Sequence, residues 1–468
     1  MDTRYEDCRA DRSVDFLGAL PTRLSALARQ HRVPGAQLAI YHDGVTTASE
    51  VGELEFRTGR PVTRDTAFAI GSITKCFTAT VAMILVADGD VELDAPIEEY
   101  VPELGGLGVS PSLRQLLSHT SGLADSCDFK DASTSTLRRY VADRVRRENF
   151  VLPPGAAFSY SNPGYAVAGR LIETITGMSW SEAVESILLR PLGVEPAFVA
   201  QPGTNSPRRP LATGHSVNAA VGRTRPVQQS AVPASIGALA MSAVDLVKLG
   251  LIHAGPGAPE LLPAADAAQM RQAVADAEPF GLADGWGLGL AVYRADAGEW
   301  VGHDGNADGT SCYLRINPAD GWVIALTANA NTGAGLWQDL LDELARASVP
   351  IAPAPAPAPV AAGLQVAPAR GCAGWFANGE VEYHVTAGSN GSVHMSVDGE
   401  NFVPLTFHDE VTFSLIDPAS GRRVLGGRFV REPATGKVYG VQAGGRLAPK
   451  QLFLRTAPWA DDRLAPAG

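Results

Sequence analysis

Residues 69–78 read Ala-Ile-Gly-Ser-Ile-Thr-Lys-Cys-Phe-Thr, and a strongly apolar run follows them as far as residue 88. This pattern predicts a buried helix that begins near Ser72 and carries Lys75 one turn later, with both side chains on one face. A serine hydroxyl is a poor nucleophile until a base takes its proton, and a lysine that a dry pocket keeps neutral can be that base. Unpaired N–H groups at the start of the helix can stabilise an oxyanion. Ser-x-x-Lys occurs once in the chain, but a pattern of only two fixed residues can arise by chance.

Two further motifs give the first one a context. Tyr160 and Asn162 form a Tyr-x-Asn motif about 85 residues later, and His303 and Gly305 form a His-x-Gly motif at the edge of an expected strand. In this order and spacing the motifs resemble those of the serine β-lactamase/penicillin-binding-protein superfamily, whose usual set includes Ser-Asp-Asn and Lys-Thr-Gly. His119 belongs to another segment that is similar to this superfamily, and we interpret it as structural.

The resemblance implies a role for each residue of the first two motifs. Ser72 would be acylated, and Lys75 would act as base or proton relay. Tyr160 would pass protons between Ser72 and the leaving or incoming group, and Asn162 would hydrogen-bond to Lys75 and to the substrate backbone. Each residue alone also has an ordinary structural explanation, and it is their joint occurrence that favours an active site. The sequence leaves open whether Lys75 or Tyr160 is the working base.

The third motif would line the pocket and complete the oxyanion hole. The resemblance implies that His303 and Gly305 lie on a strand beside the nucleophile, and that the N–H groups of Asn306 and Ser72 bind the oxyanion. His303 stands where the superfamily usually has a lysine that helps to receive a substrate carboxylate. A mostly neutral imidazole is a weaker carboxylate receptor than an ammonium group. We therefore expect an ester, thioester or amide substrate without a free carboxylate at that place.

The expected fold class is α/β, of the α+β kind, with a β-lactamase/transpeptidase-like domain over residues 10–348. A helix and hairpin in residues 16–51 and strands in residues 286–328 predict one antiparallel sheet built from both ends of this domain, flanked by helices and a helical subdomain. The alternating Ala-Pro run in residues 349–362 predicts a linker. Short alternating segments in residues 363–460 predict an antiparallel meander that forms a small, lipocalin-like barrel.

Composition and charge exclude several classes of function. The 468 residues carry a net charge of −12, so no basic surplus exists for binding nucleic acid. The start of the chain is polar and no run is apolar for long enough to span a membrane, so we expect no signal peptide, no membrane contact and a cytoplasmic location. The five cysteines include no Cys-x-x-Cys pair, and we expect neither a disulfide framework, nor a metal site, nor a cofactor.

Several local segments, residues 32–41, 189–198 and 302–309 among them, are similar to penicillin-binding-protein-type thioesterases, the nonribosomal peptide macrocyclases of the surugamide-cyclase type. The resemblance implies that the enzyme takes a linear peptidyl thioester from the pantetheine arm of a peptidyl carrier protein onto Ser72. The N-terminal amine of the peptide would then attack and give a head-to-tail macrolactam. A cytoplasmic esterase or a D-amino-acid peptidase or amidase is the alternative. A non-enzymatic relative is a further one, against which the intact motifs speak.

Water exclusion at such a site needs a cover, and the C-terminal domain is the natural candidate. Arg446 could reach the pocket from that domain, although a surface arginine is the simpler interpretation. An acidic carrier protein needs a basic face to dock on. The arginines that could provide it lie on one expected helix, at positions 138, 139, 144, 146 and 147. A solvated helix face explains the same cluster.

Overall fold

The centre of the molecule is a seven-stranded antiparallel sheet. The computed structural model describes residues 15–125, 136–199, 209–218, 221–255, 257–295, 298–353, 355, 366–388, 391–416 and 423–451. The strand order is β2-β1-β11-β10-β9-β8-β7. These strands are β1 (Gly35–His42), β2 (Val45–Gly52), β7 (Gly285–Trp286), β8 (Ala291–Ala295), β9 (Gly298–Ala307), β10 (Thr310–Ile316) and β11 (Val323–Ala328). Because β1 pairs with β11, from Ala36↔Ala328 to Tyr41↔Val323, the expected sheet built from both ends of the domain is confirmed.

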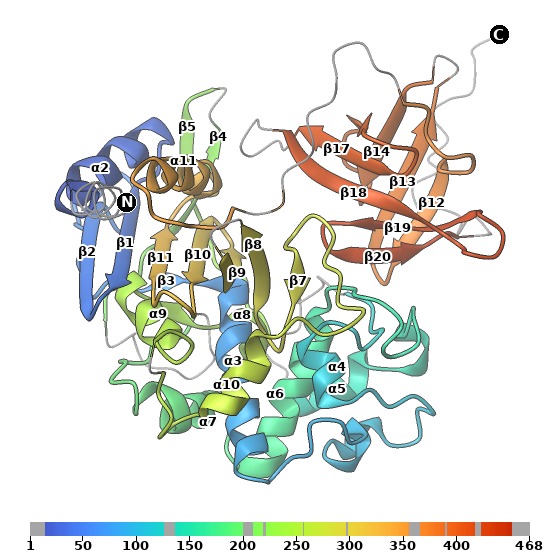
Figure 1. Cartoon of the computed structure of the whole chain (residues 1–468), viewed down its shortest axis with the longest axis horizontal. Helices are drawn as coiled ribbons and strands as arrows, with labels where there is room; N and C mark the ends of the chain where they lie inside the picture. Colours follow the sequence, from blue (N-terminus) through green and yellow to red (C-terminus); the bar gives the residue numbers. More distant parts are fainter. Residues whose placement is uncertain are drawn as a thin grey trace, which may run out of the picture.

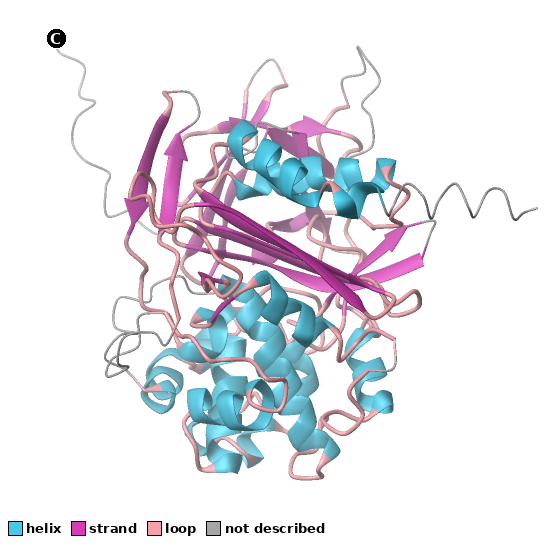
Figure 2. Cartoon of the chain, turned by 90° about the vertical axis from the view of Figure 1, so that its left-hand side faces the viewer, coloured by secondary structure: helices cyan, strands magenta, loops and turns pink. Residues whose placement is uncertain are grey.

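Helices cover both faces of this sheet, so the first part of the chain has three layers (Figure 2). On one face lie α2 (Leu20–Gln30) and α11 (Gly333–Arg346), whose apolar sides pack on Leu38, Ile324 and Leu326. A larger group of helices lies on the other face. It consists of α3 (Thr74–Ala87), α4 (Leu113–Leu117), α5 (Leu137–Arg144), α6 (Asn162–Thr176), α7 (Trp180–Ala183), α8 (Ala234–Gly237), α9 (Ala243–Gly250) and α10 (Ala264–Arg271).

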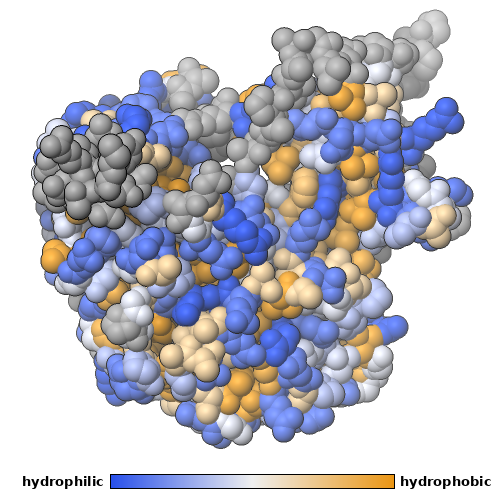
Figure 3. Space-filling model, viewed as in Figure 1, coloured by the Kyte–Doolittle hydropathy of each residue, from blue (hydrophilic) through white to orange (hydrophobic). Residues whose placement is uncertain are grey.

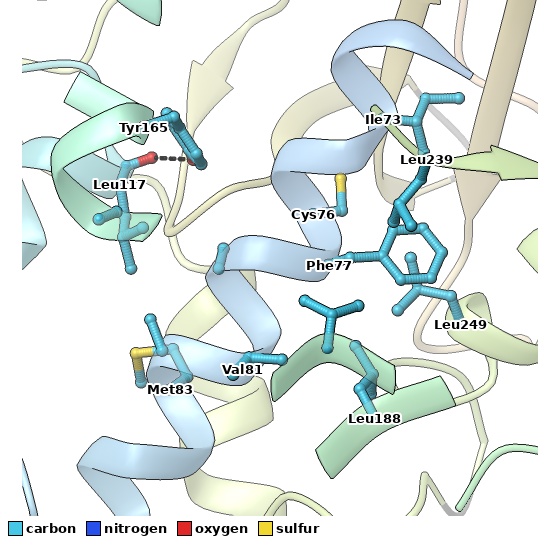
Figure 4. Packing of buried hydrophobic residues seen from close by; sticks show 14 of the residues in the cluster. Ile73, Cys76, Phe77, Val81, Met83, Leu117, Tyr165, Leu188, Leu239 and Leu249 are labelled. Atoms are coloured by element: carbon cyan, nitrogen blue, oxygen red, sulfur yellow. Dashed lines mark hydrogen bonds between the residues drawn. The ribbon is translucent and has the colours of Figure 1, made fainter. Parts of the chain in front are cut away.

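Helix α3 runs through the centre of that second layer, and it is buried on nearly all sides. Phe77 and Val81 point into a cluster that includes Leu188 and Leu249 (Figure 4). The threonines of the helix are tolerated there because each hydroxyl has a partner; Thr78 Oγ1, for example, donates to the Ser235 carbonyl at 2.8 Å. A helix fixed in this way gives the residues at its start a rigid position.

The C-terminal part consists of two antiparallel sheets around a shared core of aromatic and aliphatic residues. One sheet contains β12 (Gly374–Asn378), β13 (Val381–Ala387), β14 (Val393–Val397) and β15 (Val403–Pro404). The other contains β16 (Thr406–Phe407), β17 (Thr412–Ile416), β18 (Arg423–Arg431), β19 (Val438–Ala443) and β20 (Arg446–Pro449). Within the described residues the two ladders are joined only by an isolated bridge between Phe376 and Lys450, and the expected closed barrel is not formed.

The start of the Pro-rich stretch packs on the first part of the molecule. Val349, Ile351 and Ala352 are buried in the core between the sheet and helices α2 and α11. The carbonyl of Pro350 accepts a hydrogen bond from Trp300 Nε1 at 2.6 Å. The chain is therefore anchored as far as residue 352, while residues 356–362 of the expected linker lie outside the described residues.

Several local expectations differ from the structure. The first of the strands expected in residues 286–328 is split into β7 and β8 around Gly287 and Gly289. The pairing of β4 (Gly214–Asn218) with β5 (Arg223–Val227) was not expected, and neither were β12 and β20. The C-terminal sheets lie beside β7 and above α4 and α5 (Figure 1), and hydrophobic residues reach the surface where they meet the rest of the molecule (Figure 3). No helix among the described residues is long and apolar enough to cross a bilayer.

Candidate active site

Ser72 lies in the 3₁₀ turn η1 (Gly71–Ile73), which leads directly into α3. Lys75, one turn later, is completely buried, and its Nζ donates to Ser72 Oγ at 2.9 Å and to the Ile236 carbonyl at 3.2 Å. The structure thus brings the predicted pair into direct contact. A base in such contact with a serine hydroxyl can take its proton.

Tyr160 completes the group around the nucleophile. Its side chain hydrogen-bonds to Ser72, and its ring centroid lies 5.2 Å from Lys75 Nζ. Burial raises the pKa of Tyr160 well above its usual value, and the hydrogen bond to Ser72 offsets only part of that shift. The phenol is therefore protonated at neutral pH, the state in which it can donate a proton.

Asn162 follows at the start of helix α6. The sequence begins a helix here because Ser161 caps it, accepting a hydrogen bond from the Gly164 N–H at 3.2 Å, and because Pro163 suits the first helical turn. Asn162 is nearly buried, and its backbone N–H donates to Asp125 Oδ1 at 2.8 Å. The hydrogen bonds to substrate and to Lys75 that the resemblance implies for its side chain remain predictions.

The third motif lies on β9, immediately beside the nucleophile turn. A Cβ atom at Gly305 would collide with the Ile70 carbonyl, and a Cβ atom at Gly71 would collide with the backbone of Asn306. Only glycine at these two positions allows the turn and the strand to approach so closely. Strand β8 pairs with β9 only as far as Gly302, so the edge of β9 from His303 onward faces η1. The backbone of Asn306 thus lies against Gly71, the residue before Ser72, and the oxyanion hole made from the Ser72 and Asn306 N–H groups stays a prediction.

His303 is buried among aromatic rings, 5.2 Å from Trp286 and 6.4 Å from Tyr160 between centroids. Burial, together with the charge of Lys75, lowers the pKa of His303 to about 4. Its Nδ1 lies 2.6 Å from the Asp304 carbonyl and donates to it, so Nε2 carries the lone pair. The imidazole is thus neutral at pH 7, which agrees with the expectation of a weak carboxylate receptor.

His119 supports Tyr160 from behind. The two rings stack at 4.1 Å, and the His119 carbonyl and Nδ1 accept hydrogen bonds from the N–H groups of Ser159 (2.8 Å) and Ser161 (3.1 Å). Its φ of 58° lies in the left-handed region, so the surrounding contacts hold a strained backbone. These contacts agree with the structural interpretation of His119.

Arg446 reaches the site from β20 of the C-terminal sheets. Its Cζ lies 5.8 Å from the centroid of the Tyr160 ring, and its Nε donates to Asp125 Oδ2 at 2.6 Å. It is therefore not a simple surface arginine. Sequence reasoning missed Asp125, which no motif includes. The only signal was its place three residues after residues 116–122, the segment that contains His119.

Comparison with known proteins agrees with this geometry. The Beta-lactamase family profile matches residues 20–348, well over half of the chain. The chain belongs to the Beta-lactamase family. Members of this β-lactamase/penicillin-binding-protein superfamily are serine hydrolases and acyltransferases, and this chain has the same fold.

Three relatives of this family are similar over large parts of the chain. The crystal structure of SurE superimposes with a TM-score of 0.81 and 39% identity over 95% of this chain and 100% of SurE. Penicillin-binding protein 4 of Amycolatopsis lactamdurans is 34% identical over 340 residues, which are 69% of this chain and 87% of that protein. The Unguisins hydrolase ungD' of Aspergillus campestris is 27% identical over 368 residues, 73% of this chain and 67% of that protein.

Proposed function

We propose that this family member is a peptidyl thioesterase that releases a nonribosomal peptide from its carrier as a macrolactam. The observation that carries the proposal is the similarity to SurE, a surugamide cyclase, which spans both the catalytic part and the C-terminal sheets. The contact between Ser72 and Lys75 supplies the chemistry that the proposal needs.

In the first step Ser72 Oγ attacks the thioester carbonyl. Its proton passes to Lys75 Nζ, and the oxyanion is bound by the N–H groups of Ser72 and Asn306. The C–S bond then breaks, the sulfur takes a proton through Tyr160 or Lys75, and the thiol of the pantetheine arm leaves. Ser72 now carries the peptide as an ester.

In the second step the N-terminal amine of the bound peptide attacks this ester. The amine loses a proton to the Lys75–Tyr160 pair, and Ser72 Oγ regains one as the C–O bond breaks, which leaves an amide and the free enzyme. Cyclisation requires that the amine outcompete water, through proximity and exclusion of solvent. We expect Arg446 and the C-terminal sheets, which lie next to Tyr160, to hold the folded peptide.

The acyl end of the peptide is proposed to be a D-residue. SurE has also been crystallised with D-Leu, and that structure superimposes with a TM-score of 0.78 and 39% identity. The neutral state of His303 fits a substrate whose carbonyl is already esterified to a thiol, since no free carboxylate needs a cation there.

One assay separates cyclisation from hydrolysis. Linear peptidyl thioesters of a short pantetheine mimic are offered with a D- or an L-residue at the acyl end, and products are identified by mass spectrometry. We expect cyclic product from the D-substrate and none with Ser72→Ala. Linear acid as the sole product would favour the second candidate, a peptide hydrolase or esterase, which the similarity to the Unguisins hydrolase supports.

The carrier protein is proposed to dock on the arginine cluster of α5 and the following turn. Arg139 is largely exposed and pairs with Asp143, whereas Arg144 lies 3.8 Å from Glu380 in the C-terminal sheets. Arg139→Glu with Arg147→Glu therefore tests docking without disturbing that contact. We expect slower turnover of the carrier-bound peptide and unchanged turnover of the small thioester; equal effects on both would contradict the docking site.

A further inference from the structure

The segment that carries Tyr160 is held between two parts of the chain that are far apart in sequence. The four consecutive N–H groups of residues 159–162 all have partners, and the partners alternate as they do along a strand. Ser159 and Ser161 donate to His119. Tyr160 donates to the Gly445 carbonyl at 2.9 Å, and Asn162 donates to Asp125 Oδ1 at 2.8 Å.

The second pair of these contacts depends on the C-terminal sheets. Gly445 belongs to the turn between β19 and β20, and Asp125 is tied to the same turn through Arg446. The backbone N–H of Asp125 also donates to Asn378 Oδ1 at 2.7 Å, at the end of β12. The C-terminal sheets thus fix the backbone of Tyr160 directly and that of Asn162 through Asp125.

Asn378 and Ser159 extend this connection. Asn378 Nδ2 donates to Ser159 Oγ at 3.0 Å and to the Leu447 carbonyl at 2.7 Å. The Leu447 N–H donates to the same Ser159 hydroxyl at 3.2 Å. All of these groups are buried, so a contact that is lost is not replaced easily by water.

We infer that Asp125 is a positioning residue that couples docking of the C-terminal sheets to the placement of Tyr160 and Asn162. Its carboxylate is completely buried and joins Arg446 on one side to the start of α6 on the other. In this view the C-terminal sheets do more than cover the site; they complete the geometry required for acylation of Ser72. The inference rests on Ser72 acylation as in the proposed function, but not on cyclisation.

The test compares two isosteric substitutions at ion pairs between the same two parts of the chain. Asp125→Asn keeps an oxygen for the Asn162 N–H but removes the charge that binds Arg446. Glu278→Gln weakens the exposed pair with Arg428 of β18, where Nη2 and Oε2 are 2.7 Å apart and both carboxylate oxygens accept from Arg428. Ser159→Ala, which removes only the shared hydroxyl, serves if Asp125→Asn does not fold.

Acylation is followed by rapid mixing with p-nitrophenyl butyrate at saturating concentration, under conditions where thermal denaturation shows each variant to be folded. We expect Asp125→Asn to lower the acylation rate constant at least about tenfold with little change in the apparent substrate affinity, and Glu278→Gln to change it less than about twofold. Ser159→Ala should fall in between.

A folded Asp125→Asn enzyme that is acylated as fast as wild type, or an equal loss in Glu278→Gln, overturns the inference. This outcome differs from failure of the proposed function. If wild type reacts with the nitrophenyl ester but not with any peptidyl thioester, the thioesterase proposal fails, while the comparison of the variants still decides the role of Asp125.

Discussion

At the scale of single residues, the contact of Tyr160 with both Ser72 and His119 separates its chemical role from its packing role. Tyr160→Phe removes the hydroxyl that reaches Ser72 but keeps the ring that stacks on His119. We expect acylation to slow by about 10²–10⁴-fold, the usual contribution of a positioned proton donor, with an unchanged melting temperature. Stopped-flow acylation and thermal denaturation measure the two effects. A rate within a few-fold of wild type would assign the relay to Lys75 alone.

His303 gives a prediction about stability and pH. Its pKa is lowered to about 4 by burial, so the unfolded chain binds a proton that the folded chain rejects as the pH falls. Above the ordinary histidine pKa the imidazole is neutral in both states, and the free energy of unfolding is at its full value. This free energy falls as the pH drops from there towards about 4, because only the unfolded chain takes up the proton. Between about pH 7.5 and pH 5 this loss amounts to about 2 kcal/mol.

Urea unfolding at these two pH values tests the prediction. The fall in unfolding free energy from the higher to the lower pH should be smaller in His303→Gln than in wild type by about that amount. His394→Gln, at a half-exposed position on β14, is the control and should leave the fall unchanged. The same fall in wild type and in His303→Gln would show that His303 is not the group responsible.

At the scale of elements, the close approach of η1 to β9 depends on two glycines. A methyl group at Gly305 would collide with the Ile70 carbonyl, which the backbone on both sides holds in place. We expect Gly305→Ala to cost about 1–3 kcal/mol in stability and to displace Ser72 from Asn306, lowering acylation about 100-fold. Gly18→Ala, where a Cβ meets nothing within 4 Å, is the control for both measurements. Unchanged acylation in folded Gly305→Ala would contradict this account.

The elements also show how much of the site could be predicted from the sequence. The Ser-x-x-Lys and Tyr-x-Asn motifs lie at helix starts, and apolar periodicity and helix-start residues such as Ser161 and Pro163 reveal these starts. The two strands that bring Asn378 and Arg446 to the site were missed. Strand β20 is only Arg-Leu-Ala-Pro, without alternation of apolar and polar residues. Asp125, the residue that Arg446 binds, lies 321 residues earlier in the chain. Pairings of this kind depend on tertiary packing, which local patterns do not encode.

At the scale of the whole molecule, the catalytic part and the C-terminal sheets should unfold together. Buried polar groups of one part hydrogen-bond to the other part: Asn378 of the C-terminal sheets, for example, bonds to Ser159 and Asp125 of the catalytic part. Separating the two parts would leave these groups without partners. In urea, pulse-labelling hydrogen exchange should give the same midpoint for peptides from β12–β13 and from α6. Loss of protection in β12–β13 at a lower urea concentration, with α6 still protected, would show that the two parts are independent.

The division of contacts along residues 159–162 also bears on how such enzymes can be recombined. A chimera joined at the Ala-Pro stretch would combine the Tyr160 segment of one parent with the β19–β20 turn of another, and the two surfaces would no longer match. The unit that can be exchanged intact includes Asp125 together with Asn378 and residues 444–447. Libraries that keep this set from a single parent should yield more active members than libraries cut at the linker, although both preserve every residue of the three sequence motifs.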